Sequence, residues 1–198
     1  MKYVAFCDPS GGSSDSMTLA IAHLSLFKKC VLDGVWERRP PFSPDAVCEE
    51  FAGVLATYRV RVVTGDRYSA QWVVERFLAH GVTYQHSLKT RSEIYGEFAA
   101  LVNSGRVRMP SSKRLRTQFQ SLERRSSRSG RDTIDHPPAS HDDAANAAAG
   151  ALTLAAGGLN PAPEPWSWCP TSDPTPRQSA FENLSPIDEG PESWWQRL

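Results

Sequence analysis

Acidic side chains stand at the ends of two short apolar runs and at the start of an alanine-rich run. Asp8 follows YVAFC, Asp66 follows RVRVVTG, and Asp142 and Asp143 precede AANAAAGALTLAAGG. Carboxylates that converge on one small volume repel one another unless a cation neutralises them. Hard oxygen ligands select Mg²⁺ or Mn²⁺. Two such ions about 4 Å apart are the usual apparatus for hydrolysing phosphodiesters. These residue types therefore predict a two-metal centre.

The elements that would position these carboxylates follow from apolar periodicity and turn residues. Three β-like runs come first, and helices begin only after them. Ser43 and Pro44 open the first helix, and Gly81 and Gly105 close the second and third. The predicted strands are 2–7, 17–25, 30–37, 59–66 and 82–87, and the predicted helices are 43–58, 69–81, 90–105, 112–125 and 141–158, with a loop over 126–140.

This order places three strands before alternating helices and strands. Right-handed crossovers put the fourth strand beside the first and parallel to it. The predicted fold class is α/β and ribonuclease H-like, with a five-stranded mixed sheet in the order 3-2-1-4-5 flanked by helices. Neighbouring strands lie about 4.8 Å apart, so Asp8 and Asp66 would meet at adjacent strand ends. Asp8 is then the predicted ligand shared by both metals.

Four segments together resemble a known family: FCDPSGG, VVTGDRYSAQWVVERFLAHG, SLKTRSEIYGEFAALVNSGRVRMP and DHPPASHDDAANAAAG. They are similar to the C-terminal nuclease domain of the large terminase subunit of tailed bacteriophages, over about Lys2 to Gly158. The resemblance implies that Asp8 and Asp66 are metal ligands and that the third ligand lies in the Asp142–Asp143 pair. Asn146 stands where some relatives carry another Asp.

The resemblance also implies an activity and partners. The activity is a two-metal endonuclease that uses Mg²⁺ or Mn²⁺ to cut concatemeric phage DNA during genome packaging. The partners are double-stranded DNA, a packaging ATPase domain, the small terminase subunit and a portal protein. The sequence contains no G-x-x-x-x-G-K-[ST] phosphate loop, so this chain by itself is not expected to translocate DNA. A phage or prophage origin implies the host cytoplasm.

A basic segment precedes the alanine-rich run. Between residues 106 and 131 there are nine basic residues and one acid, although Lys plus Arg and Asp plus Glu both number 22 in the whole chain. Such a stripe is either a footprint for a polyanion or a solvated face. The candidate DNA-binding residues are Lys113, Arg114, Arg116, Arg124, Arg125 and Arg128.

Other features bound the class of protein. No apolar run approaches the roughly 18 residues that span a bilayer, so no membrane partner is expected. The four cysteines are scattered, without zinc-ligand spacing, which favours reduced thiols in a cytoplasmic protein. The predicted domain covers 1–158. Residues 159–198 form a Pro- and Trp-rich tail, expected to be extended because frequent Pro forbids long helices.

Two other classes of function stay open. A catalytically inactive or remnant terminase domain would bind DNA or a portal protein without cutting. In that case Asp142 can be a helix N-cap and Asp66 a turn residue. Sugar-kinase-like and actin-like ATPases share the same sheet, and DPSGGSSD faintly resembles their phosphate hairpin. The absence of a second Gly-rich hairpin in the sequence disfavours them.

Overall fold

The centre of the molecule is a mixed sheet, seen in a computed structural model that describes residues 1–66, 71–126, 132–137 and 140–157. β1 (Tyr3–Asp8), β2 (Met17–Leu24) and β3 (Cys30–Arg38) form an antiparallel meander. β4 (Val62–Gly65) and β5 (Thr83–His86) extend the sheet in parallel beyond β1. The short β6 (Val107–Arg108) pairs with β3. The order β5-β4-β1-β2-β3-β6 confirms the predicted order and adds one strand.

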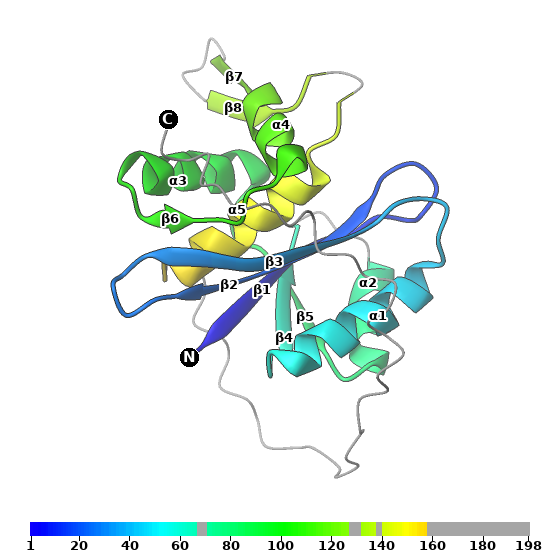
Figure 1. The fold of residues 1–198 in the computed structure, drawn as a ribbon. Helices are drawn as coiled ribbons and strands as arrows, with labels where there is room; N and C mark the ends of the chain where they lie inside the picture. Colours follow the sequence, from blue (N-terminus) through cyan, green and yellow to red (C-terminus); the bar gives the residue numbers. More distant parts are fainter. Residues whose placement is uncertain (67–70, 127–131, 138–139, 158–198) are drawn as a thin grey trace.

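Helices cover both faces of this sheet (Figure 1). α1 (Pro44–Thr57) and α2 (Gln71–Ala79) pack on one face. α5 (Asp143–Ala155) lies across β1, β2 and β3 on the other face, where α3 (Arg91–Asn103) and α4 (Lys113–Ser121) pack against it. The ribonuclease H-like α/β class is thus confirmed. Among the described residues, none of these helices is long and apolar enough to cross a membrane. The predicted tail 159–198 lies outside the described residues.

The alternation of side chains along β1 determines which way Asp8 points. Phe6 belongs to the core under α5, whereas Ala5 and Cys7 belong to the core under α1. Successive strand residues face opposite sides of a sheet. Asp8 therefore shares the face of Phe6 and is directed toward α5.

Gly150 allows α5 to lie unusually close to the sheet. A Cβ atom at Gly150 would lie 2.3 Å from the Phe6 ring. One helical turn before Gly150 is Asn146, and two residues beyond Phe6 is Asp8. Both steps span about 6 Å. The close contact of Gly150 with Phe6 thus brings Asn146 to the level of Asp8.

Gly150→Ala is expected to lower the free energy of unfolding by about 1–3 kcal/mol, because the added methyl group overpacks the core against the Phe6 ring. Gly96→Ala is the matched control. Gly96 is an exposed glycine inside α3, and a Cβ atom there would meet nothing within 4 Å. That change should stabilise the protein by up to about 1 kcal/mol through helix propensity. Urea unfolding of both variants checks the pair, and equal stabilisation by both would contradict the close contact.

The basic segment differs from its prediction. The helix expected over 112–125 ends at Ser121, and its last residues belong instead to β7 (Glu123–Ser126). β7 forms a hairpin with β8 (Asp132–Asp135), which lies in the expected loop. Ile134 packs against the core under α5, and its backbone exchanges hydrogen bonds with the Ser92 hydroxyl of α3. These distant contacts hold β8 in place, and pairing with β8 makes residues 123–126 a strand in place of the predicted end of the helix.

Candidate active site

Asp8 and Asp66 come to adjacent strand ends, as the crossover argument predicts. Cys7 of β1 pairs with Gly65 of β4. Asp8 directly follows Cys7, and Asp66 directly follows Gly65. Gly65 permits this approach, because a Cβ atom there would lie 2.6 Å from the Cys7 carbonyl oxygen. Asp8 is 7% exposed, and the Asp66 side chain is 20% exposed.

The start of α5 is fixed beside Asp8 by two hydrogen bonds. Thr18 pairs with Asp8 in the β1–β2 register, and its hydroxyl donates to the Asp143 carbonyl oxygen at 2.8 Å. The side-chain amide of Asn146 donates to Asp8 Oδ2 at 2.9 Å. Asp142 is the N-cap residue of α5 and makes no side-chain cap hydrogen bond, so its carboxylate is used elsewhere.

Arg91, which the sequence analysis did not select, links two of the predicted carboxylates. Its Nη2 lies 3.3 Å from Asp66 Oδ2, and its Nη1 lies 3.2 Å from Asp142 Oδ1. The Tyr95 hydroxyl donates to Asp142 Oδ2 at 2.6 Å. Arg91 and Tyr95 are four residues apart and therefore share one face of α3. The four-residue spacing of Arg91 and Tyr95 is the sequence signal that could have suggested this pair. The spacing does not identify which other element this face of α3 contacts.

Burial raises the pKa values of the two carboxylates that Arg91 does not contact, Asp8 and Asp143. Burial raises the pKa of Asp8 to about 7; the Arg91 charge and the Asn146 hydrogen bond oppose this shift, and Asp143 and Asp66 add to it. Burial and then the charge of Asp142 raise the pKa of Asp143, whereas His141 lowers it. A cation bound beside Asp8 would keep that carboxylate ionised at neutral pH.

The pKa values of two α3 side chains, Arg91 and Tyr95, are raised as well. Burial lowers the pKa of Arg91, but the nearby carboxylates, Asp8 first among them, outweigh burial and raise it above its ordinary value. Burial and the adjacent Asp142 charge raise the pKa of Tyr95 well above its usual range. Arg91 thus stays charged, and Tyr95 stays a hydrogen-bond donor to Asp142.

Two buried oxygen atoms supply the test of whether these residues fit a metal. Asp143 Oδ2 and Asn146 Oδ1 are both buried, and neither has a hydrogen-bond partner in the described structure. A buried acceptor without a partner costs about 1–3 kcal/mol. With Asp8 they form an all-oxygen donor set, which fits Mg²⁺ or Mn²⁺. Within the described ranges, however, no three His, Cys, Asp or Glu side chains are grouped closely enough to hold one ion.

The predicted DNA-binding residues fall on α4 and the β7–β8 hairpin. Arg114 forms an ion pair with Glu37 of β3, and Arg125 pairs with Glu123 at 2.7 Å. Lys113 and Arg116 are exposed on α4, and Arg124 is exposed on β7. Arg128 lies outside the described residues. The chain leaving β8 reaches the site, because His136 Nε2 lies 3.7 Å from Asp142 Oδ1.

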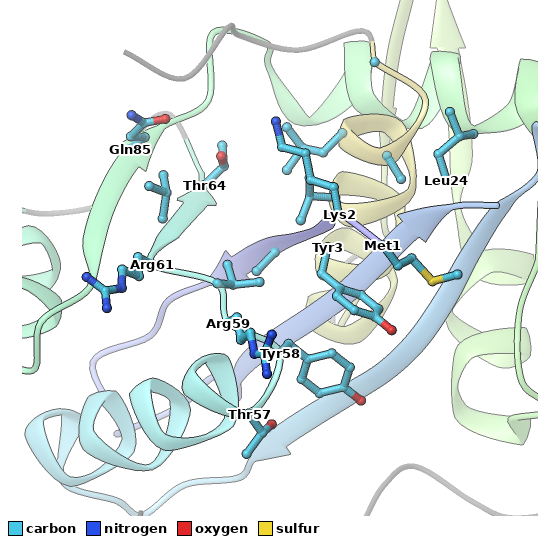
Figure 2. A pocket seen from close by; sticks show the side chains of 17 residues that line it. Met1, Lys2, Tyr3, Leu24, Thr57, Tyr58, Arg59, Arg61, Thr64 and Gln85 are labelled. Carbon is cyan, nitrogen blue, oxygen red and sulfur yellow. The ribbon is translucent and has the colours of Figure 1, made fainter. Parts of the chain in front are cut away.

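A separate groove lies at the opposite end of the sheet (Figure 2). It is lined by the first residues of β1, by the loop between α1 and β4, and by the end of α5. Lys2, Arg59 and Arg61 contribute positive charge to its lining. None of the four predicted acidic residues lines it, so this groove is not part of the candidate active site.

Comparison with solved structures shows that this fold is similar to the nuclease domains of phage large terminases. The large terminase nuclease of thermophilic phage G20c with bound magnesium superposes with a TM-score of 0.64 at 18% identity, covering 76% of this chain and 80% of that chain. The HK97 bacteriophage large terminase superposes with a TM-score of 0.61 at 16% identity, covering 76% of this chain and 39% of that chain. The nuclease domain from bacterial virus Sf6, with manganese, gives 0.59 at 12% identity over 77% and 88% of the two chains.

The G20c nuclease also has a structure with bound cobalt, and that structure matches at a TM-score of 0.62. No protein-family profile matches the sequence, and a search of curated proteins finds no match either. At these identities the likeness defines the fold. The chemistry must therefore be argued from the residues of this chain.

Proposed function

We propose that this chain is a terminase-type, metal-dependent DNA endonuclease that cuts phage DNA during genome packaging. The observation that carries the proposal is the pair of buried oxygen atoms of Asp143 and Asn146 without hydrogen-bond partners, together with the Asn146 amide that donates to the Asp8 carboxylate. Buried polar atoms normally have hydrogen-bond partners, and a bound metal ion would supply one for these two oxygens. The terminase-like fold and the metals in its structural neighbours support the same reaction class.

Three carboxylates are proposed to hold the metal ions: Asp8, Asp66 and Asp143. Asp8 has the central position, because it lies between the other strand end and the start of α5. Asp143 is favoured over Asp142, because both oxygens of Asp142 already accept hydrogen bonds from Arg91 and Tyr95. Two divalent cations held there would supply an activated water and stabilise the leaving oxygen during phosphodiester hydrolysis.

Other residues hold the elements around this centre together or are proposed to bind the DNA. Tyr95 and Asp142 tie α3 to the start of α5, and Thr18 holds the first turn of α5 against β2. Exposed basic residues on α4 and β7 are proposed to contact the phosphates of double-stranded DNA, which positions the duplex without reading its sequence. A packaging ATPase domain, the small terminase subunit and a portal protein are the partners proposed with this activity.

Nicking of supercoiled plasmid tests the proposal. The wild-type protein should nick or linearise plasmid with Mn²⁺ or Mg²⁺ and should be inactive in EDTA. Asp8→Asn should be inactive with either metal. Asp45→Asn serves as the control, because Asp45 forms an exposed ion pair with Arg76 on the other face of the sheet. Cleavage in EDTA would exclude the metal mechanism, and metal-independent DNA binding without any cleavage would favour the inactive terminase domain.

A further inference from the structure

We propose that Arg91 is a built-in counterion that is anchored on Asp142 and competes with divalent cations for Asp66, and so limits how tightly the centre binds metal. This inference rests on the proposed function, since it concerns the same site. It assigns Arg91 a positioning role rather than a catalytic one, because Arg91 acts on the carboxylates.

The geometry shows that one guanidinium group serves both carboxylates. Its two terminal nitrogens lie 3.3 Å from Asp66 and 3.2 Å from Asp142, so the fork of Arg91 is used on both sides. The planar guanidinium is suited to such a bridge, and its charge persists at all relevant pH values. A metal ion bound at Asp66 Oδ2 would therefore lie beside the positive charge of Arg91, which opposes its binding.

Arg91 is held in place by its position on α3. It is the first residue of the helix and directly follows the N-cap Thr90, which forms a capping box with Glu93. The next residue, Ser92, exchanges hydrogen bonds with the backbone of Ile134 in β8. The backbone under Arg91 is thus fixed from both sides, and its side chain is 31% exposed. Any exchange between Arg91 and a metal must come from movement of the side chain alone.

The described contacts divide the site into two halves. On one side Asp8, Asp143 and Asn146 include two buried oxygens without hydrogen-bond partners. On the other side Asp66 and Asp142 share the charge of Arg91. A divalent cation is attracted to the first half and is opposed by the guanidinium when it engages the second. Removal of the guanidinium charge should therefore strengthen metal binding.

Isothermal titration of the whole chain with Mn²⁺, after treatment with chelator, measures this directly. Arg91→Gln should bind Mn²⁺ about tenfold more tightly than wild type, the effect expected when a unit charge about 6 Å from a divalent ion is removed in a water-like dielectric. The Mn²⁺ affinity of Arg91→Lys should lie between those of wild type and Arg91→Gln, because one ammonium group cannot form the same planar bridge. Arg76→Gln removes an exposed arginine from α2 and should bind Mn²⁺ as wild type does.

Equal or weaker Mn²⁺ binding by Arg91→Gln would overturn the inference. If that variant does not fold, Arg91→Met, which also removes the charge, decides the question, and wild-type affinity in it would also overturn the inference. Asp8→Asn separates the two proposals. Wild-type binding that Asp8→Asn abolishes, together with unchanged affinity in the Arg91 variants, contradicts the counterion role alone. Absence of Mn²⁺ binding by the wild-type protein contradicts the proposed function and this inference together.

Discussion

Asp143→Asn is expected to lose more than about 100-fold of the metal-dependent cleavage activity while its free energy of unfolding stays within about 1 kcal/mol of wild type. The Asp143 Oδ2 atom has no hydrogen-bond partner to lose, and the amide oxygen of an Asn can accept the backbone hydrogen bond that Ser16 donates to Asp143, so the fold should not depend on the charge of Asp143. As a proposed direct ligand it should matter at least as much as groups that only orient ligands, whose loss typically costs 10- to 100-fold.

Asp142→Asn should behave differently, because Asp142 connects α5 to α3 through Arg91 and Tyr95. Breaking a buried, hydrogen-bonded charge pair costs about 3–5 kcal/mol. Urea unfolding and plasmid cleavage measured on both variants separate these roles. If Asp142→Asn abolished cleavage with wild-type stability and Asp143→Asn still cleaved, the third ligand would be Asp142.

Asp8→Asn is expected to stabilise the metal-free protein at alkaline pH by up to about 4 kcal/mol. The pKa of Asp8 is raised from 3.8 to about 7 in the folded protein, chiefly by burial. Each pKa unit corresponds to about 1.4 kcal/mol. Between about pH 4 and pH 7 the unfolded chain releases this proton and the folded chain keeps it. The stability of wild type should therefore fall as pH rises through that window.

Unfolding in EDTA at several pH values measures this difference. Wild type and Asp8→Asn should be equally stable near pH 4, and the gap should grow until about pH 8. The substituted amide can still pair with Asn146, whose Oδ1 has no other partner, so the variant should fold. A gap that does not change with pH would mean that Asp8 ionises as easily in the folded state as in the unfolded chain.

Local signals were sufficient to predict the sheet. Alternating apolar runs indicate the strands, and the handedness of crossovers places β4 next to β1. The meeting of Asp8 and Asp66 follows from that order and is seen in the pairing of Cys7 with Gly65. The two-residue β6 was not predicted, because a strand of that length is too short to show an alternation of apolar and polar residues.

The contacts that organise the candidate site depend instead on distant packing. Arg91 and Tyr95 meet Asp142 only because α3 lies against α5, and the sequence contains no signal for that pairing. Thr18 is likewise placed by its register opposite Asp8. The β7–β8 hairpin was missed because Ile134 is stabilised by Ser92 of α3, more than 40 residues away in the chain. The metal-ligand assignment itself stays a prediction.

Anomalous diffraction from crystals soaked in Mn²⁺ tests the central claim most directly. We expect manganese peaks bound by the Asp8 carboxylate, with Asp143 and Asp66 as further ligands, and the Arg91 guanidinium displaced from Asp66. Absence of manganese at Asp8, with Asn146 still paired to Asp8 and Arg91 still bridging Asp66 and Asp142, would contradict it.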